Sequence, residues 1–150
     1  MREVIALSIE NVRSGRGGPF AAVVVKEGAV IARGVNLVTS TNDPTAHAEV
    51  VAIRAACQTL SSFQLTGCEI YSSCEPCPMC LGAIYWARLA RYYYGNSRLE
   101  AAKINFNDSL IYDEISKPPE SRTIPGVHLL ADAAAEAFRE WMRSPLKVPY

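Results

Sequence analysis

Residue types that bind transition metals occur in two short stretches of this sequence. His47 lies two residues before Glu49, and Cys77 lies three residues before Cys80. Two cysteines three residues apart face the same side of a helix, so their sulfur atoms can hold one ion. One imidazole and two thiolates suit Zn²⁺ and leave a fourth coordination position open for water. The two stretches therefore predict a zinc site of the open, catalytic kind.

Glu49 is the residue in these stretches that could transfer protons. It lies two residues from His47, so on a helix it does not share the face of that ligand. Zinc lowers the pKa of a bound water toward neutral, and a carboxylate beside that water can accept and return its proton. A His-x-Glu stretch followed by Pro-Cys-x-x-Cys is the general pattern of zinc-dependent base deaminases, in which the glutamate is not a ligand. We therefore predict that Glu49 is a proton shuttle.

Alternatives to a catalytic zinc site involve the neighbouring cysteine. Cys74 lies three residues before Cys77, so a closed structural site could consist of Cys74, Cys77, Cys80 and His47. Such a site gives Glu49 no role, and it requires three ligands from one helix. A thioredoxin-like redox pair is a second alternative, although the upstream histidine does not favour it. The remaining cysteines, Cys57 and Cys68, are expected to be small buried apolar residues, and His128 is expected to pack within an apolar strand.

Composition limits the classes of protein to which this chain can belong. It has 150 residues, 49% of them hydrophobic, and 15 basic residues balance 15 acidic ones, so the net charge is zero. A chain of this length and composition can form one domain with its own core. It is too apolar for disorder and not basic enough to hold nucleic acid mainly through phosphate contacts. Zero net charge also gives little repulsion between copies, which favours self-association.

Cysteine usage and the distribution of apolar residues predict a cytoplasmic location. The first apolar run, Val4 to Leu7, is too short for a signal sequence or a membrane span. Five cysteines are an odd number, and three of them crowd between residues 74 and 80. That crowding indicates metal chemistry rather than a disulfide framework.

The periodicity of the sequence indicates which elements position these residues. Helical spacing of Ile5, Ile9 and Val12 predicts a helix that ends at Gly15. Two β-branched runs around Glu27-Gly28 predict a hairpin. Helices are expected over 44–60, 77–87, 108–115 and 133–142, and strands over 21–25, 30–36, 69–73, 91–95 and 127–130. Helices that alternate with strands after a hairpin predict a layered α/β fold with some parallel pairing.

At these residues the sequence resembles the cytidine deaminase superfamily of zinc-dependent nucleobase deaminases, and within it the bacterial guanine deaminases. The similarity extends over nearly the whole chain. The matching stretches are Gly17 to Phe20, Asn42 to Glu49, Ser73 to Arg88, Asn107 to Tyr112, Arg122 to Pro125 and the terminal Tyr150. The His-Ala-Glu and Pro-Cys-x-x-Cys motifs are specific for the superfamily. Tyr85-Trp86, Asp108 and Tyr150 are typical of the guanine branch.

The resemblance implies a three-layer fold in which helices flank a central five-stranded mixed sheet. It also implies one Zn²⁺ per subunit, a single deaminase domain over residues 1–150, and a homodimer. In this branch the C-terminal segment, here about residues 132–150, is exchanged between subunits and closes the partner's site. A membrane partner is not expected, and the balanced charge argues against nucleic acid.

The resemblance also assigns roles to individual residues. His47, Cys77 and Cys80 would bind zinc, and Glu49 would be the proton shuttle. Asn36 and Asp108 would hydrogen-bond the edge of a purine base, because an amide both donates and accepts whereas a carboxylate accepts from ring N–H groups. Tyr150 would cap the pocket, and the aromatic side chains of Phe20, Trp86 and Phe106 would line it. A turn residue at Asn36, a helix cap at Asp108 and core packing for the aromatic residues are the structural alternatives.

The reaction that the resemblance implies is hydrolytic deamination of guanine to xanthine and ammonia. A tRNA adenosine deaminase is the alternative within the superfamily, but it requires a basic surface to hold its RNA. Guanosine, triazines and cytosine are further possible substrates of such a site. A structural Cys₃His zinc module that binds a protein partner is the alternative from another class.

Overall fold

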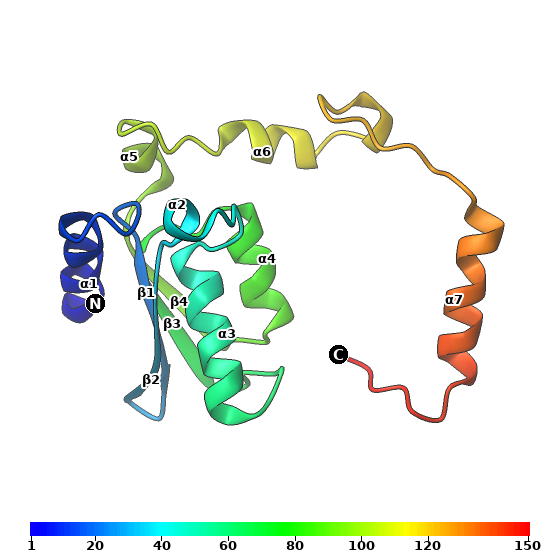
Figure 1. The fold of residues 1–150 in the computed structure, drawn as a ribbon, viewed down its shortest axis with the longest axis horizontal. Coiled ribbons are helices and arrows are strands. Elements are labelled where there is room, and N and C mark those ends of the chain that lie inside the picture. Colours follow the sequence, from blue (N-terminus) through cyan, green and yellow to red (C-terminus); the bar gives the residue numbers. More distant parts are fainter. The chain divides into compact units, whose positions relative to one another are not determined.

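The structure, a computed structural model, describes residues 1–150, and the chain divides after Asp108 into two compact units. The first unit, residues 1–108, has a four-stranded sheet with helices on both faces (Figure 1). The second unit, residues 109–150, contains helices only. The elements of the first unit are α1 (Arg2–Arg13), β1 (Ala21–Lys26), β2 (Ala29–Val35), α2 (Val38–Thr41), α3 (Ala48–Leu60), β3 (Cys68–Cys74), α4 (Pro78–Trp86), β4 (Arg91–Asn96) and α5 (Arg98–Ala102).

The sheet has the strand order β2-β1-β3-β4. Strand β1 pairs antiparallel with both β2 and β3, and the expected hairpin turns at Glu27 and Gly28, both with positive φ. Strands β3 and β4 are parallel, so a crossover must connect them, and α4 is that crossover. This topology places the N-terminus of α4 directly after the end of β3, which is where the Cys77 motif lies.

The layers of the first unit are α1 on one face of the sheet and α3 with α4 on the other (Figure 1). The main core lies between α3 and the sheet, and it includes Val24, Ile53, Leu65, Ile70 and Ile84. A smaller core of Val4, Ala21 and Val23 lies beneath α1. Many alanines in the main core, among them Ala22, Ala48 and Ala52, allow α3 to lie close to the strands. This packing therefore fixes the position of α3 on the sheet, and with it the position of the N-terminus of the helix.

A glycine makes the closest contact between α3 and the sheet. A Cβ atom on Gly34 in β2 would lie 2.2 Å from the Ala48 carbonyl oxygen and 2.5 Å from the Ala52 amide nitrogen. Both atoms belong to the helix backbone and cannot rotate away. We expect Gly34→Ala to lower the free energy of unfolding by about 3 kcal/mol, because overpacking of this kind must displace α3. Chemical denaturation of the purified variant measures this change.

Gly82 in α4 provides the matched control for that substitution. A Cβ atom on Gly82 meets no other atom within 4 Å. Alanine there should stabilise the protein by about 1 kcal/mol through its higher helix propensity. A Gly34→Ala variant that unfolds at the wild-type denaturant midpoint would contradict the role given to this contact.

The start of α3 differs from the prediction. The sequence predicted a helix from Pro44, but α3 begins at Ala48, and Pro44 and Thr45 lie in a turn. In that turn the Asp43 carboxylate accepts hydrogen bonds from the Thr45 amide at 2.8 Å and the Thr45 hydroxyl at 2.6 Å. This side-chain turn competes with the helix for the same backbone donors. It leaves His47 as the extended residue that precedes α3.

The number of strands also differs, because the sheet has four strands where five were expected. The expected fifth strand, Val127–Leu130, lies in the second unit without strand conformation. Val127, Leu129 and Leu130 are highly exposed there. An apolar segment becomes a strand only when a neighbouring strand pairs with its backbone groups, and this segment has no such neighbour. Its apolar, β-branched pattern alone therefore led to a wrong prediction. The other predicted strands and helices are confirmed, with shifts of a few residues at their ends.

The second unit consists of α6 (Ser109–Ile115), a short 3₁₀ helix (η1, Pro119–Ser121) and α7 (Ala131–Arg143). None of its residues is buried, although it carries many large apolar side chains. It therefore has no hydrophobic core of its own. In the chain as a whole, every helix is too short or too polar to cross a membrane.

Candidate metal centre

The metal-ligating residues lie where the N-termini of α3 and α4 approach each other. His47 is the N-cap of α3 with extended backbone (φ −68°, ψ 153°), and Cys77 is the N-cap of α4 (φ −65°, ψ 168°). Pro78 follows Cys77 at the first helical position, where its missing N–H is not needed. Cys80 lies in the first turn of α4 and is fully buried. Each side chain is thus fixed by a helix start.

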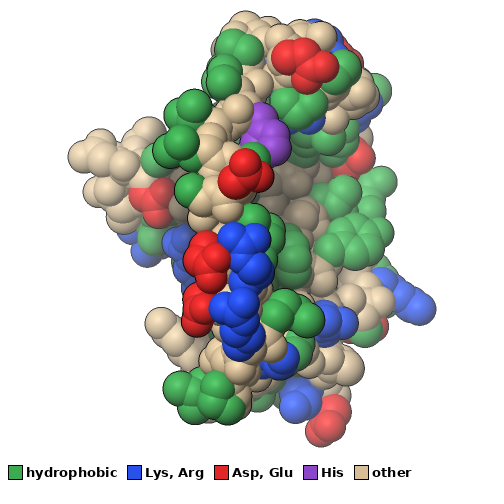
Figure 2. Space-filling model, turned by 90° about the vertical axis from the view of Figure 1, so that its right-hand side faces the viewer, with side chains coloured by type: hydrophobic (Ala, Val, Ile, Leu, Met, Phe, Trp, Pro, Cys, Tyr) green, Lys and Arg blue, Asp and Glu red, His purple; other side chains and the backbone are tan.

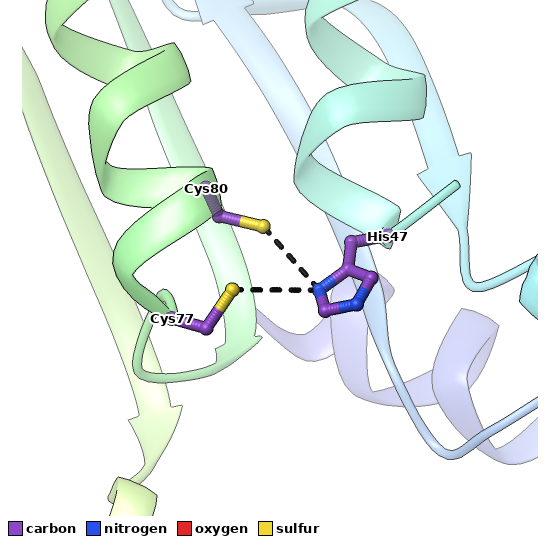
Figure 3. A group of neighbouring side chains, drawn as sticks. All are labelled: His47, Cys77 and Cys80. Carbon is purple, nitrogen blue, oxygen red and sulfur yellow. Dashed lines mark hydrogen bonds between the residues drawn. The ribbon is translucent and has the colours of Figure 1, made fainter. Parts of the chain in front are cut away.

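The three side chains point toward one another, as Figure 3 shows. The Nδ1 atom of His47 lies 3.5 Å from the sulfur of Cys77 and 3.5 Å from the sulfur of Cys80. All three ligand atoms lie within 4.8 Å of one another. Zinc bonds of about 2.0–2.1 Å to nitrogen and about 2.3 Å to sulfur at tetrahedral angles place nitrogen and sulfur about 3.5 Å apart. The donor set and its spacing therefore fit one tetrahedral zinc ion with a fourth position left open.

The electrostatic environment favours a thiolate at Cys77. The hydrogen bond from the Cys80 thiol, supported by His47, lowers the pKa of Cys77 to about 4 in spite of its partial burial. The contact with Cys77 in turn raises the pKa of His47. The N-terminus of α4 adds partial positive charge beside the sulfur. The thiolate is the form of cysteine that binds metals, so the lowered pKa of Cys77 favours binding of a cation.

Glu49 lies beside the ligands without belonging to them. It is in the first turn of α3 and is buried, and the Ser72 hydroxyl donates a 2.9 Å hydrogen bond to its Oε1 atom. Its Oε2 atom lies 3.4 Å from the sulfur of Cys80. Burial raises the pKa of this carboxyl above its ordinary value. A carboxyl with a raised pKa next to an open metal position has the properties that a proton shuttle needs.

Ser72 is a site residue that the sequence reasoning missed. It lies in β3, two residues after the core residue Ile70, and the alternation of a strand directs both to the same face of the sheet. That face is covered by α3, which carries Glu49. The signal was therefore present as a polar residue at a core position of the strand.

Asn36 and two of the aromatic residues lie together around the glycine loop that precedes β1. Asn36 directly follows β2, is buried, and accepts a 3.3 Å hydrogen bond from the Gly18 amide through its Oδ1 atom. This bond fixes the orientation of the carboxamide and leaves its Nδ2 donors for a ligand. The rings of Phe20 and Phe106 meet edge to face with centroids 4.8 Å apart.

The remaining predicted residues are placed differently. Asp108 is half-buried, and burial together with the negative charge of Cys77 raises the pKa of its carboxyl, as expected for a group near the ligands. Trp86 is 69% exposed at the C-terminal end of α4, about 13 Å along the helix axis from Cys77. Tyr150 is 70% exposed at the end of the second unit. The pocket roles of Trp86 and Tyr150 therefore stay predictions.

Comparison with known proteins places this site in a family. Residues 1–96 match the model of the cytidine and deoxycytidylate deaminase zinc-binding region. The guanine deaminase of Bacillus subtilis is 51% identical over 150 residues, which cover all of this chain and 96% of that protein. Its crystal structure superimposes with a TM-score of 0.97 over 99% of this chain and 95% of that chain.

Two more distant relatives differ in how much of the chain they match. A structure of guanine deaminase from Nitrosomonas europaea is 31% identical, with a TM-score of 0.68 over 92% of this chain and 80% of that chain. The tRNA-specific adenosine deaminase of Agrobacterium fabrum is 49% identical, but the match covers only 51% of each protein. The zinc-binding family model and the His47, Cys77 and Cys80 cluster together support one zinc ion per subunit. The chain belongs to the cytidine and deoxycytidylate deaminase family of zinc-dependent enzymes.

Proposed function

We propose that this protein is a guanine deaminase, which converts guanine and water to xanthine and ammonia. The observation that carries this proposal is the extent of the similarity. The Bacillus subtilis guanine deaminase matches the whole chain, including residues 109–150, whereas the tRNA-specific adenosine deaminase of Agrobacterium fabrum matches only about half. The second unit, which lies outside the matched family model, is therefore part of the guanine deaminase likeness.

We infer the roles in the reaction from the resemblance together with the positions of the side chains. His47, Cys77 and Cys80 would hold the zinc ion, which lowers the pKa of a water molecule at its open position. Glu49 would accept the proton of the attacking water and pass it to a ring nitrogen of the base. The same carboxylate would then take the remaining proton from the hydroxyl group added to the ring carbon and give it to the amino group, which leaves as ammonia. Ser72 holds Glu49 in place through the 2.9 Å hydrogen bond.

Recognition of the base would come from one amide, one carboxylate and aromatic rings. The Nδ2 donors of Asn36 suit an acceptor on the purine, and the carboxylate of Asp108 suits ring N–H donors. Phe20 and Phe106 would supply the stacking surface. Trp86 and Tyr150 would complete the pocket wall and its cap.

A second candidate function, deamination of adenosine in tRNA, has little support from charge. Basic and acidic side chains are equal in number, and on the face in Figure 2 they lie next to each other rather than forming a basic patch. In α7, Arg139 and Arg143 both pair with Glu136. Paired charges of this kind are a poor surface for a polyanion, whose binding requires unpaired cations.

An ammonia-release assay distinguishes these functions. The purified zinc-loaded protein is incubated separately with guanine, guanosine, adenine, cytosine and a tRNA. Release of ammonia from guanine, with rates at least about 100-fold lower for the others, supports the proposal. Deamination of the tRNA without turnover of free guanine would overturn it.

Cys74 tests whether the zinc site is catalytic or a closed structural Cys₃His site. Its sulfur donates to the Ser97 carbonyl oxygen at 3.7 Å and lies outside the His47, Cys77 and Cys80 cluster. Burial raises its pKa to about 11, so it stays a thiol. We expect Cys74→Ala to keep one zinc per subunit, as measured by plasma mass spectrometry, and to lose about 1–2 kcal/mol of stability. Loss of zinc in this variant would favour the structural module.

We further propose a homodimer in which the second unit docks on another copy of the chain. The unit carries thirteen exposed large apolar residues: Leu110, Ile111, Ile115, Ile124, Val127, Leu129, Leu130, Phe138, Trp141, Met142, Leu146, Val148 and Tyr150. A 42-residue unit without a buried residue cannot be stable alone. Exposed apolar surface of this extent is typical of an obligate interface. Light scattering should give twice the 16.4 kDa mass of one chain, whereas a monomer would contradict the proposal.

Exchange of residues 132–150 can be tested by complementation. Chains with Glu49→Gln are co-expressed with chains that carry Tyr150→Ala. If Tyr150 caps the partner's site, the mixed dimer contains one site with both native residues, and activity returns. If Tyr150 acts within its own subunit, no site is intact and activity stays low.

The five cysteines form no disulfide, which supports the predicted cytoplasmic location.

A further inference from the structure

We propose that Asn11 is a positioning residue that sets the orientation of the Asn36 carboxamide and thereby the affinity for the base. The inference rests on the proposed function, in which Asn36 contacts the substrate. Asn11 lies in α1, and it reaches the residues around the site through hydrogen bonds rather than by contact with the ligands.

The contacts of Asn11 join two separate segments. Its Nδ2 atom donates to the carbonyl oxygen of Gly18 at 2.9 Å and to the carbonyl oxygen of Asn36 at 2.9 Å. Gly18 belongs to the loop before β1, and Asn36 follows the end of β2. One amide group therefore uses both of its N–H donors to fix two backbone positions that are 18 residues apart in sequence.

The same two residues are also joined directly to each other. The Gly18 amide donates to the Oδ1 atom of Asn36 at 3.3 Å, and the Asn36 amide donates to the Phe20 carbonyl oxygen at 3.0 Å. Gly17 lies so close that a Cβ atom there would be 2.2 Å from the Asn36 carbonyl oxygen. Because the 3.3 Å bond is long, its alignment depends on the backbone positions that Asn11 holds. The carboxamide of Asn36 is thus oriented from the backbone of Gly18, and that backbone from Asn11.

Burial distinguishes Asn11 from a residue that only fills space. The side chain is fully buried, and its Oδ1 atom is the one buried side-chain polar atom of the chain without a hydrogen-bond partner. An unpaired buried carbonyl is unfavourable, and an asparagine inside a helix is a weak helix former. These costs are offset only through the two bonds of Nδ2. A role that depends on those bonds therefore accounts for the residue better than packing does.

Steady-state kinetics with guanine test this inference. Asn36→Ala is expected to raise KM about tenfold, and Asn11→Ala about fivefold, with kcat within about twofold of the native value and full zinc content. Ser8→Ala is the matched control, because Ser8 lies in the same helix, is buried, and bonds only to Ile5. It should leave KM unchanged. Asn11→Ser provides a second variant in case alanine does not fold, since one short hydroxyl cannot reach both carbonyl oxygens.

The double variant Asn11→Ala with Asn36→Ala separates positioning from general destabilisation. If Asn11 acts through Asn36, the double variant should have the KM of Asn36→Ala alone. If the two increases in KM multiply, or if Asn11→Ala lowers thermal stability without raising KM, the inference is wrong. If Asn36→Ala itself leaves KM for guanine unchanged, the substrate role of Asn36 in the proposed function fails instead.

Discussion

Replacement of Glu49 by glutamine is expected to lower kcat by about 10²–10⁴-fold while the protein keeps its zinc. Glutamine has nearly the same size and can still accept the hydrogen bond from Ser72, so the site should keep its shape. Its amide cannot take up the proton of water or protonate the leaving amino group. Because burial raises the pKa of Glu49, the native carboxyl can hold a proton during the reaction, and this is the property that the variant loses.

The measurement is kcat for ammonia release together with zinc content on the same preparation. Glu69→Gln is the matched control, because it removes the same charge from β3, where Glu69 accepts from the hydroxyls of Tyr71 and Tyr93. That variant should keep native kcat. A fully zinc-loaded Glu49→Gln enzyme with a near-native kcat would show that another group moves the proton.

The ligand set could be predicted from sequence because it depends on local spacing. Cys77 and Cys80 are one helical turn apart, so any helix that starts at Pro78 brings them together. His47 and Glu49 are likewise close in sequence, and their different orientations follow from the helix start between them. The spacing could not predict that the N-terminal ends of α3 and α4 lie next to each other. That juxtaposition comes from the parallel β3 and β4 strands and the packing of α3 on the sheet.

The features that were missed depend on contacts between distant segments. Ser72 and Asn11 act through side-chain hydrogen bonds to residues at least 7 positions away, and their residue types alone do not reveal such partners. The fifth strand was wrong for the opposite reason. Val127–Leu130 has the composition of a strand, but a strand exists only beside a neighbour, and the first unit has only four. Its exposed apolar residues are part of the evidence that the second unit needs another surface.

The second large effect is expected for Cys80→Ala, which should lose zinc, activity and stability together. Cys80 is fully buried, and its sulfur is one of the three atoms that fit a tetrahedral ion. Removal of one ligand leaves only His47 and Cys77, one fewer than the three protein ligands that a catalytic zinc site needs. A bound ion at about 1,000 times its dissociation constant stabilises the folded state by about 4 kcal/mol, and the variant forfeits this term. The variant should therefore unfold at a lower temperature than the native protein, and chelator should not lower that temperature further.

Thermal unfolding with and without chelator, paired with metal analysis, measures this effect because it separates metal loss from cavity formation. Chelator should lower the melting temperature of the native protein to that of its metal-free form. It should leave the melting temperature of Cys80→Ala unchanged. Cys57→Ala is the matched control, since Cys57 is a half-buried cysteine of α3 outside the metal cluster, so its variant should bind zinc and respond to chelator like the native protein. Cys80 is one of the three assigned ligands, and its sulfur is the only fully buried one in the cluster. If Cys80→Ala retained one zinc per subunit, the ligand assignment would therefore be wrong.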